Sequence, residues 1–164
     1  MLFREKNHVK EISIVMRLTL YTDYSLRVLL YLAYHEGKNV TITELADFYK
    51  VSRNHLVKVV HELGKNGYIL TTRGKKGGIR LAHHPQDIVI GGVVRKTEPD
   101  FDLLECFNPE TDNCVISQTC TLKRMLYEAQ FNFIKVLDQY SLADAAKQSS
   151  SKNMDFKNIP LKTI

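Results

Sequence analysis

The feature that most constrains this fold is a pair of short helical patterns followed directly by a glycine-rich hairpin. Thr41 and Glu44 have the spacing of a capping box, which predicts the start of the first helix. Ser52 is a suitable N-cap for the second helix, and Gly67 is expected to end it. Two β-rich runs then flank Arg73-Gly-Lys-Lys-Gly-Gly78. This order of elements is typical of a winged helix-turn-helix.

Further helices are expected on both sides of this unit. Apolar residues recur at helical spacing within Tyr21–Glu36, and Ile88–Lys96 is a candidate linking helix. From Thr121 onward the same spacing continues for about five turns. Phe131 and Ile134 add apolar surface on another side of that helix, which favours a dimer interface. The predicted fold is therefore mainly α with a small β-wing, and it joins a winged helix-turn-helix domain to a long dimerisation helix.

The chain has 164 residues, the length of about one domain with an appended element. No apolar run is long enough to span a membrane, and the charged N-terminus does not resemble a signal peptide, so we expect a cytoplasmic protein. The expected organisation is an extension that is disordered or untranslated (1–15), a winged-helix domain (16–98), a cysteine loop (99–120), dimerisation and C-terminal helices (121–146) and a flexible tail (147–164).

Charge is divided unevenly along the chain. Between Ser52 and Arg80 there are seven Lys or Arg residues and one acidic residue, Glu62. Between Thr97 and Cys120 there are six acidic residues and no Lys or Arg. The first segment is suited to a polyanion, which for a helix-turn-helix is double-stranded DNA.

The residues expected to contact DNA lie on the second helix and in the hairpin. The N-terminal end of such a helix enters the major groove, where Arg suits guanine and Asn suits adenine. The hairpin offers cations and closely approaching backbone for phosphate or the minor groove. A nucleotide-binding P-loop is disfavoured because the glycines precede a strand and are not followed by Gly-Lys-Ser/Thr. The candidates are Ser52, Arg53, Asn54, His55 and Lys58 on the helix, and Arg73, Lys75, Lys76 and Arg80 in the hairpin.

The three cysteines of the chain, Cys106, Cys114 and Cys120, are spaced C-x7-C-x5-C. An odd number of thiols in a reducing compartment argues against a disulfide framework. The close C-x2-C pairs of most zinc sites are absent, whereas three thiolates on one loop could hold an iron–sulfur cluster. Three unrelated thiols, or a metal-free thiol redox switch, are the alternatives. No arrangement of His, Ser or Cys resembles a hydrolytic centre, so we expect no enzymatic activity.

Four motifs in combination resemble a known family. They are Met16-Arg-Leu-Thr-Leu-Tyr-Thr-Asp-Tyr-Ser-Leu-Arg27, Val51-Ser-Arg-Asn-His-Leu-Val-Lys58, Arg73-Gly-Lys-Lys-Gly-Gly-Ile-Arg-Leu81 and the cysteine loop. Together they resemble the NsrR family of nitric-oxide-sensing repressors, which belongs with IscR to the dimeric winged-helix iron–sulfur regulators. The resemblance begins at Met16, which is therefore a candidate translation start.

The resemblance implies a homodimeric transcriptional repressor that binds a palindromic operator and releases it when nitric oxide attacks its cluster. It implies one [4Fe–4S] cluster per subunit, with a [2Fe–2S] cluster as the alternative. In NsrR-like proteins three Cys hold the cluster, and in some members an Asp from the partner's first helix is the fourth ligand. The matching residue here is Asp23. An IscR-like site would use a His where this chain has Lys123.

Without the resemblance, Asp23 would be interpreted as a helix-start carboxylate that pairs with Arg27 one turn on. If Asp23 is not the fourth ligand, Glu105, Glu110 and Asp112 are the replacement candidates nearer in sequence to the cysteines.

Overall fold

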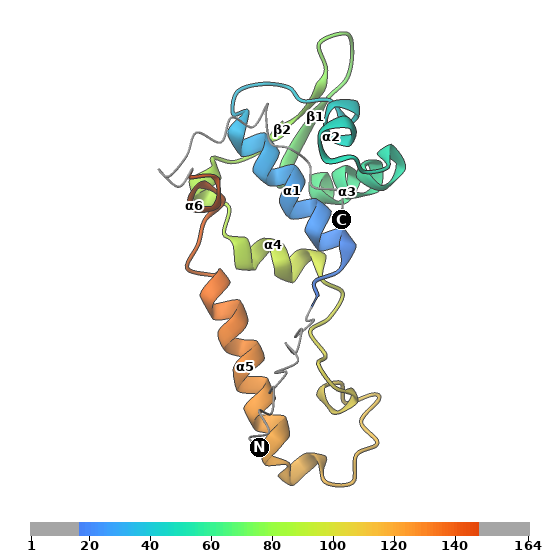
Figure 1. Cartoon of the computed structure of the whole chain (residues 1–164), viewed down its shortest axis with the longest axis vertical. Coiled ribbons are helices and arrows are strands. Elements are labelled where there is room, and N and C mark those ends of the chain that lie inside the picture. The colour runs from blue at the N-terminus through green and yellow to red at the C-terminus, as the bar shows by residue number, and fades with distance from the viewer. Residues whose placement is uncertain (1–16, 148–164) are drawn as a thin grey trace, which may run out of the picture.

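The computed structural model describes residues 17–147 and consists mainly of helices around one two-stranded antiparallel sheet (Figure 1). This confirms the predicted fold class. Three short 3₁₀ turns, η1, η2 and η3, lie between the larger elements. The elements in chain order are α1 (Leu20–Tyr34), α2 (Ile42–Tyr49), α3 (Arg53–Lys65), β1 (Ile69–Thr72), β2 (Gly78–Leu81), η1 (Pro85–Asp87), α4 (Ile90–Thr97), η2 (Glu105–Phe107), η3 (Ser117–Thr119), α5 (Thr121–Leu137) and α6 (Leu142–Ala146).

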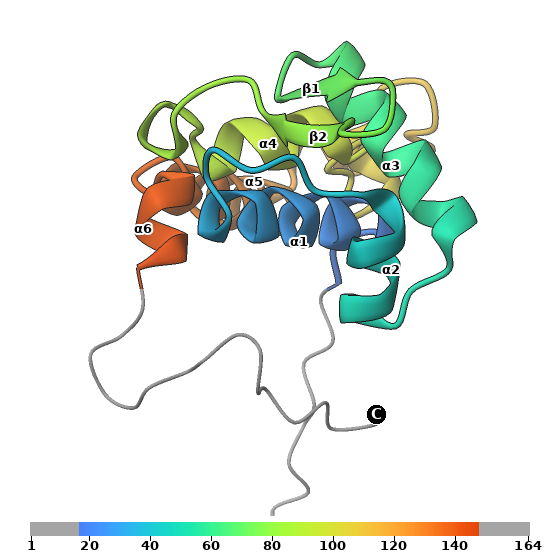
Figure 2. The same cartoon turned by 90° about the horizontal axis from the view of Figure 1, so that it is seen from above.

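The core of the winged-helix unit forms around α1, which lies beneath the sheet with α6 beside one end and α2 beside the other (Figure 2). Val28, Leu29 and Leu32 of α1 are almost completely buried. They belong to one cluster with Leu56 and Leu63 of α3, among others. Burial of each such side chain contributes about 1.5–3 kcal/mol. The apolar stripes expected from the helical spacing are therefore the stripes that form the core.

The first turn of α1 is anchored to the last turn of α4. The hydroxyl of Thr19 accepts a hydrogen bond from the backbone N–H of Thr22 at 3.2 Å and caps the helix. Glu98 accepts from the backbone N–H of Thr19 at 2.9 Å, and the buried hydroxyl of Thr22 donates to Thr97 at 2.9 Å. These bonds join residues about 75 positions apart and hold the start of α1 in a defined position.

The two strands pair from Ile69 opposite Leu81 to Thr72 opposite Gly78. Val40, in the connection between α1 and α2, pairs with β2 through an isolated antiparallel bridge. Its N–H donates to the carbonyl of Ile79 at 2.9 Å, and its carbonyl accepts from the N–H of Ile79 at 2.8 Å. At Gly77 an added Cβ would lie 2.2 Å from the carbonyl oxygen of Thr72, so the hairpin requires glycine there. We call residues 69–81 the wing.

Two details of helix capping differ from expectation. Thr41 caps α2 by accepting from the N–H of Glu44 at 3.1 Å, but the Glu44 carboxylate does not complete a capping box. It accepts instead from the hydroxyl of Tyr31 at 2.8 Å, because this largely buried tyrosine needs an acceptor. Burial and this bond raise the pKa of Tyr31 to about 12. Ser52 occupies the N-cap position of α3 but makes no capping hydrogen bond with its side chain.

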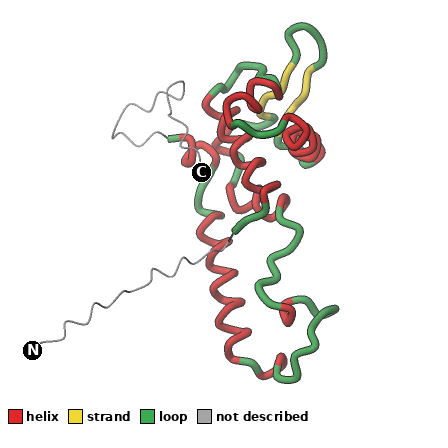
Figure 3. The backbone as a smooth tube through the Cα atoms, turned by 45° about the vertical axis from the view of Figure 1, so that its right-hand side comes forward, coloured by secondary structure: helices red, strands yellow, loops and turns green. Residues whose placement is uncertain are grey.

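The cysteine loop, residues 99–120, leads away from the winged-helix unit, and the long helix α5 returns alongside it (Figures 1 and 3). The C-terminal end of α5 is fixed to α4 by an ion pair between Arg95 and Asp138. The two nitrogen–oxygen distances of this pair are 3.0 and 2.6 Å. Backbone bonds from Ile90 to Tyr140 and from Leu142 to Ile88 reinforce this junction. The α5 helix contains no fully buried residue in the single chain.

The expected N-terminal extension and almost all of the expected flexible tail lie outside the described residues. Lys147, the first residue assigned to the tail, is described: it follows α6 as its C-cap and pairs with Asp144 at 2.6 Å.

Candidate functional site

The N-terminal half of α3 presents a polar face to solvent. All five residues expected there, namely Ser52, Arg53, Asn54, His55 and Lys58, are exposed, and we call them the recognition face. The opposite face of the helix is buried in the core through Leu56, Val59, Val60 and Leu63. The polar residues are therefore available to a partner while the apolar ones hold the helix in place.

His55 has a contact that the sequence did not indicate. Its ring stacks on Tyr24 of α1, with ring centroids 6.3 Å apart and planes inclined by 23°. This contact orients the imidazole and connects the recognition face to α1 directly.

The four cations expected in the wing, Arg73, Lys75, Lys76 and Arg80, are all exposed. The tip of the wing projects beyond the rest of the molecule (Figure 1). The side-chain amide of Asn39 donates to the carbonyl of Lys76 at 3.0 Å, which ties the tip to the connection between α1 and α2. The positive side chains of the wing therefore extend from a backbone that Asn39 holds in place.

Sequence reasoning missed Lys50 in the turn between α2 and α3. It adopts a left-handed conformation, with φ of 54°, and is the C-cap of α2. The side chain is exposed and adds a positive charge two positions before Ser52. The tight spacing of Tyr49-Lys-Val51 between two helices was the available signal, because such a turn commonly needs a left-handed residue.

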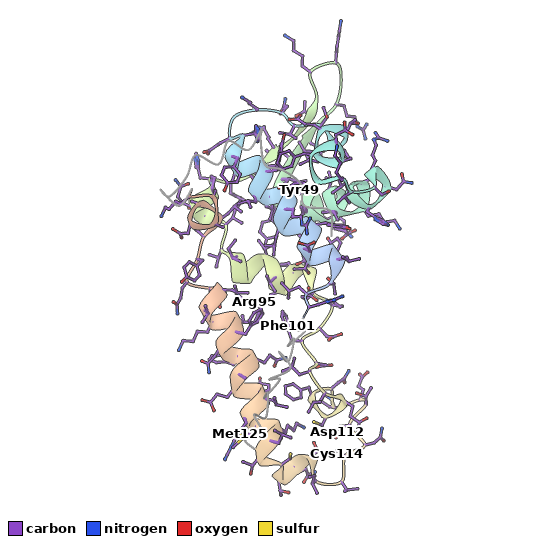
Figure 4. All side chains as sticks on the ribbon, in the orientation of Figure 1. Tyr49, Arg95, Phe101, Asp112, Cys114 and Met125 are labelled. Atoms are coloured by element: carbon purple, nitrogen blue, oxygen red, sulfur yellow. The ribbon has the colours of Figure 1, made fainter. Side chains whose placement is uncertain are left out.

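The cysteine loop lies at the opposite end of the molecule from the wing, as the labelled Asp112 and Cys114 indicate (Figure 4). Cys106, Cys114 and Cys120 are free thiols; the first is buried and the other two are partly exposed. Within residues 17–147, no group of three or more His, Cys, Asp or Glu side chains lies close enough together to hold a metal ion. The structure therefore places the three predicted ligands in one loop without bringing them together at one point.

Local hydrogen bonds organise the loop around two of its cysteines. Cys120 is the N-cap of α5, where its Sγ accepts from the backbone N–H of Lys123 at 3.3 Å. The N–H of Cys114 donates to Asp112 at 3.1 Å. The other oxygen of Asp112 accepts from the hydroxyl of Ser117 and from the ammonium of Lys123. Ser117, the backbone N–H of Cys114 and Lys123 together lower the pKa of Asp112.

The donor chemistry of the loop fits an iron–sulfur cluster. Such clusters are held by thiolates, and N–H groups directed at sulfur stabilise the charged form, as at Cys120. The thiols are therefore chemically suitable as cluster ligands, although no three such ligands within residues 17–147 lie together at one point.

Asp23, the implied fourth ligand, lies in the first turn of α1 and forms an ion pair with Arg27. Their two nitrogen–oxygen distances are 2.8 and 2.7 Å, and both side chains are substantially exposed. The guanidinium of Arg27 also lies 5.9 Å from the ring centroids of Tyr24 and Tyr49. In the single chain Asp23 thus has the local ion pair expected of a helix-start carboxylate.

A cleft of about 380 Å³ separates α5 from the segment that follows α4. Arg17, Glu98 and Phe133 are among its lining residues. Gln130 donates across it to the carbonyl of Phe101. Nearer the cysteines, the rings of Phe107 and Tyr127 lie 6.0 Å apart. These contacts connect the cysteine loop to the middle of α5.

The uncovered apolar surface of α5 and of the residues just beyond it lies on more than one side of the helix. Leu122, Met125, Tyr127, Phe131, Val136 and Tyr140 are each at least half exposed. A surface of this kind on one helix indicates an interaction site. Among the described residues, no helix is both long and apolar enough to cross a membrane.

Residues 18–148 match the Rrf2 family, described as iron-dependent transcriptional regulators. The chain is 53% identical over 130 residues to the HTH-type transcriptional regulator NsrR of Bacillus licheniformis, covering 79% of this chain and 91% of the relative. It is 52% identical over 133 residues to NsrR of Bacillus subtilis, covering 80% and 91%.

Two solved structures share the fold. The global cysteine regulator CymR of B. subtilis superposes with a TM-score of 0.65 at 24% identity, covering 80% of this chain and 97% of CymR. IscR of T. potens superposes with a TM-score of 0.66 at 21% identity, covering 87% and 96%. The curated relatives are HTH-type transcriptional regulators, in agreement with the prediction that the chain is not an enzyme. The chain therefore belongs to the Rrf2 family of transcriptional regulators, within which it is similar to the NsrR proteins.

Proposed function

We propose that the chain is a homodimeric transcriptional repressor that binds a palindromic operator and senses nitric oxide through an iron–sulfur cluster. The observation that carries the proposal is the division of one molecule into two chemically distinct ends. Exposed cations and polar side chains lie on α3 and the wing, and three free thiols lie in the acidic cysteine loop. The α5 helix connects the two ends (Figure 1).

In the proposed complex each protein residue type has a distinct task. Arg53, Asn54 and His55 contact base edges in the major groove, whereas the cations of the wing contact phosphates. Two copies of the recognition face then bind half-sites about one helical turn apart, which requires a fixed spacing between the two subunits.

The proposed cofactor is one [4Fe–4S] cluster per subunit, held by Cys106, Cys114 and Cys120, with a [2Fe–2S] cluster as the alternative. When bound, the cluster supplies iron that can react with nitric oxide. Asp23 of the partner subunit is the proposed fourth ligand. A carboxylate is a harder and weaker ligand for this iron than a thiolate, so Asp23 is the contact most readily lost.

Asp23 is well placed to couple ligand exchange to DNA binding. Its ion-pair partner Arg27 lies over Tyr49, the last residue of α2, and its neighbour Tyr24 stacks on His55 of the recognition face. A change in the position of the Asp23 carboxylate therefore acts on a segment that contacts both helices of the helix-turn-helix.

The test is anaerobic purification followed by absorbance spectroscopy and analysis of iron and acid-labile sulfide. We expect a brown protein whose operator affinity falls when nitric oxide is added, and a Cys114→Ala variant without the chromophore. A Cys114→Ala protein with a full complement of iron and sulfide would contradict the ligand assignment. An iron-free wild-type protein whose DNA affinity responds to a reversible disulfide would establish the metal-free thiol switch instead.

A further inference from the structure

Lys123 makes contacts within the cysteine loop that its position in the sequence did not indicate. It lies in the first turn of α5, and its ammonium donates to the hydroxyl of Ser117 at 2.7 Å. The same ammonium lies 3.4 Å from Asp112, and both charged side chains are less than one-third exposed. Ser117 is itself buried and donates to the same Asp112 oxygen. We call Lys123, Asp112 and Ser117 the loop clasp.

Asp112 and Lys123 of the loop clasp flank Cys114 and Cys120 in the sequence, and each makes a hydrogen bond to one of these cysteines. Asp112 accepts from the backbone N–H of Cys114 with its second oxygen, at 3.1 Å. The backbone N–H of Lys123 donates to the sulfur of Cys120 at 3.3 Å. One connected set of bonds therefore joins the backbone of one predicted ligand to the thiol of another. Cys106, buried at η2, is not part of this set.

The distribution of charge in this part of the chain favours Lys123 as the partner of Asp112. Asp112 belongs to a segment without Lys or Arg, so Lys123 is the first cation after it in the chain. A charge-assisted hydrogen bond is roughly twice as strong as a neutral one, and these groups are partly withdrawn from water. The carboxylate of Asp112 already accepts from Ser117, Cys114 and Lys123, which leaves it poorly suited to bind iron as well.

We propose that Lys123 is a positioning residue that closes the cysteine loop through Asp112 and Ser117 and so restricts the positions that Cys114 and Cys120 can take when the cluster binds. This inference rests on the proposed function of the loop. Lys123 thus supports the site from the position at which an IscR-like protein would place a ligand, and Asp112 is removed from the candidates for the fourth ligand.

The first test uses metal-free protein under anaerobic reducing conditions. Alkylation of each cysteine by iodoacetamide is followed by peptide mass spectrometry in the wild type and in Lys123→Met. Loss of a partly buried charged bond should open the loop and raise the alkylation rates of Cys114 and Cys120 by about tenfold. The rate at Cys106 should stay unchanged and serves as the internal reference.

Two further variants separate positioning from a general loss of structure. Lys123→Arg keeps the charge and donors, so it should restore the wild-type rates. Lys135→Met, at the other end of α5, is the matched control and should leave all three rates unchanged. Equal rates in Lys123→Met and the wild type would overturn the proposal, as would a uniform rise at all three cysteines or a failure of Lys123→Arg to rescue.

The second test uses the reconstituted protein. Lys123→Met should lose its cluster absorbance to a chelator about tenfold faster than the wild type, and Lys123→Arg should retain it. Equal rates of loss in Lys123→Met and the wild type would overturn the role in cluster binding. An iron-free wild-type protein would instead refute the proposed function, while the alkylation data would still decide whether the loop clasp exists.

Discussion

Asp23 has a local ion pair in the structure and, in the proposed function, a long-range role as ligand in the partner subunit. Its ion pair with Arg27 needs only the spacing of one helical turn, and such exposed pairs contribute about 0.5 kcal/mol or less. If Asp23 also binds a cluster in the partner subunit, loss of that bond to iron would affect the protein more than loss of the ion pair. The two roles can therefore be separated by measuring stability and spectrum in the same variant.

We expect Asp23→Ala to bind a cluster through the three cysteines, but with an altered absorbance spectrum and weaker operator affinity. The free energy of unfolding of the metal-free protein should fall by about 0.5 kcal/mol or less. Arg27→Ala, which removes the same ion pair, is the control for the stability change. An unchanged spectrum together with an unchanged nitric oxide response would move the fourth ligand to Glu105 or Glu110.

Lys50 holds a left-handed backbone conformation at some cost, because its Cβ approaches the following carbonyl. Lys50→Gly removes that cost and should raise the free energy of unfolding by about 0.5–1 kcal/mol. Urea titration of the metal-free protein measures the change. A lower denaturation midpoint would indicate that the lysine side chain stabilises the turn by contacts that outweigh the strain.

At the level of elements, α3 and the wing should contribute differently to DNA binding. Lys76→Ala should weaken binding to all sequences alike and reduce the slope of affinity against salt by about one, because one phosphate contact is lost. Asn54→Ala and Arg53→Ala should reduce discrimination between operators by about 1–3 kcal/mol each. Titrations on operator and random DNA at several salt concentrations distinguish the two. Equal losses on both DNAs for Asn54→Ala and Arg53→Ala would remove those residues from the base-reading set.

The α5 helix should be the main dimer contact. Phe131 is 60% exposed in the single chain, within the uncovered apolar surface. Phe131→Glu should disfavour a desolvated interface and shift the sedimentation mass from that of a dimer toward the 18.9 kDa of one chain. Lys135→Glu, also exposed on this helix, is the control. A Phe131→Glu protein that stays dimeric would place the interface elsewhere.

At the level of the whole molecule, acid should weaken several connections at once. Lys147 and Ser141 lower the pKa of Asp144, and Arg95 lowers the pKa of Asp138. A carboxylate whose pKa is depressed by folding contributes stability above its unfolded pKa of about 3.9, and that stability is lost as pH falls through the folded value. Asp144 completes the capping box of α6, which buries Leu142 in the core.

The free energy of unfolding should therefore decrease as pH falls below about 4, because the unfolded state binds more protons. Asp144→Asn removes one such carboxylate and should flatten this dependence between about pH 4 and 2. Thermal unfolding of the metal-free wild type and of Asp144→Asn at a series of pH values measures this pH dependence.

The sequence by itself determined the winged helix-turn-helix, the separation of basic and acidic segments and the exposed apolar helix. These features depend on periodicity, helix caps and turn residues, which act over a few neighbouring positions. Only the tertiary structure decided that Glu44 binds Tyr31 instead of completing a capping box, and that His55 stacks on Tyr24. Only it directed Lys123 to Asp112. Such choices depend on which distant residues arrive beside a side chain, because a buried or charged group takes the best available partner once the core has formed.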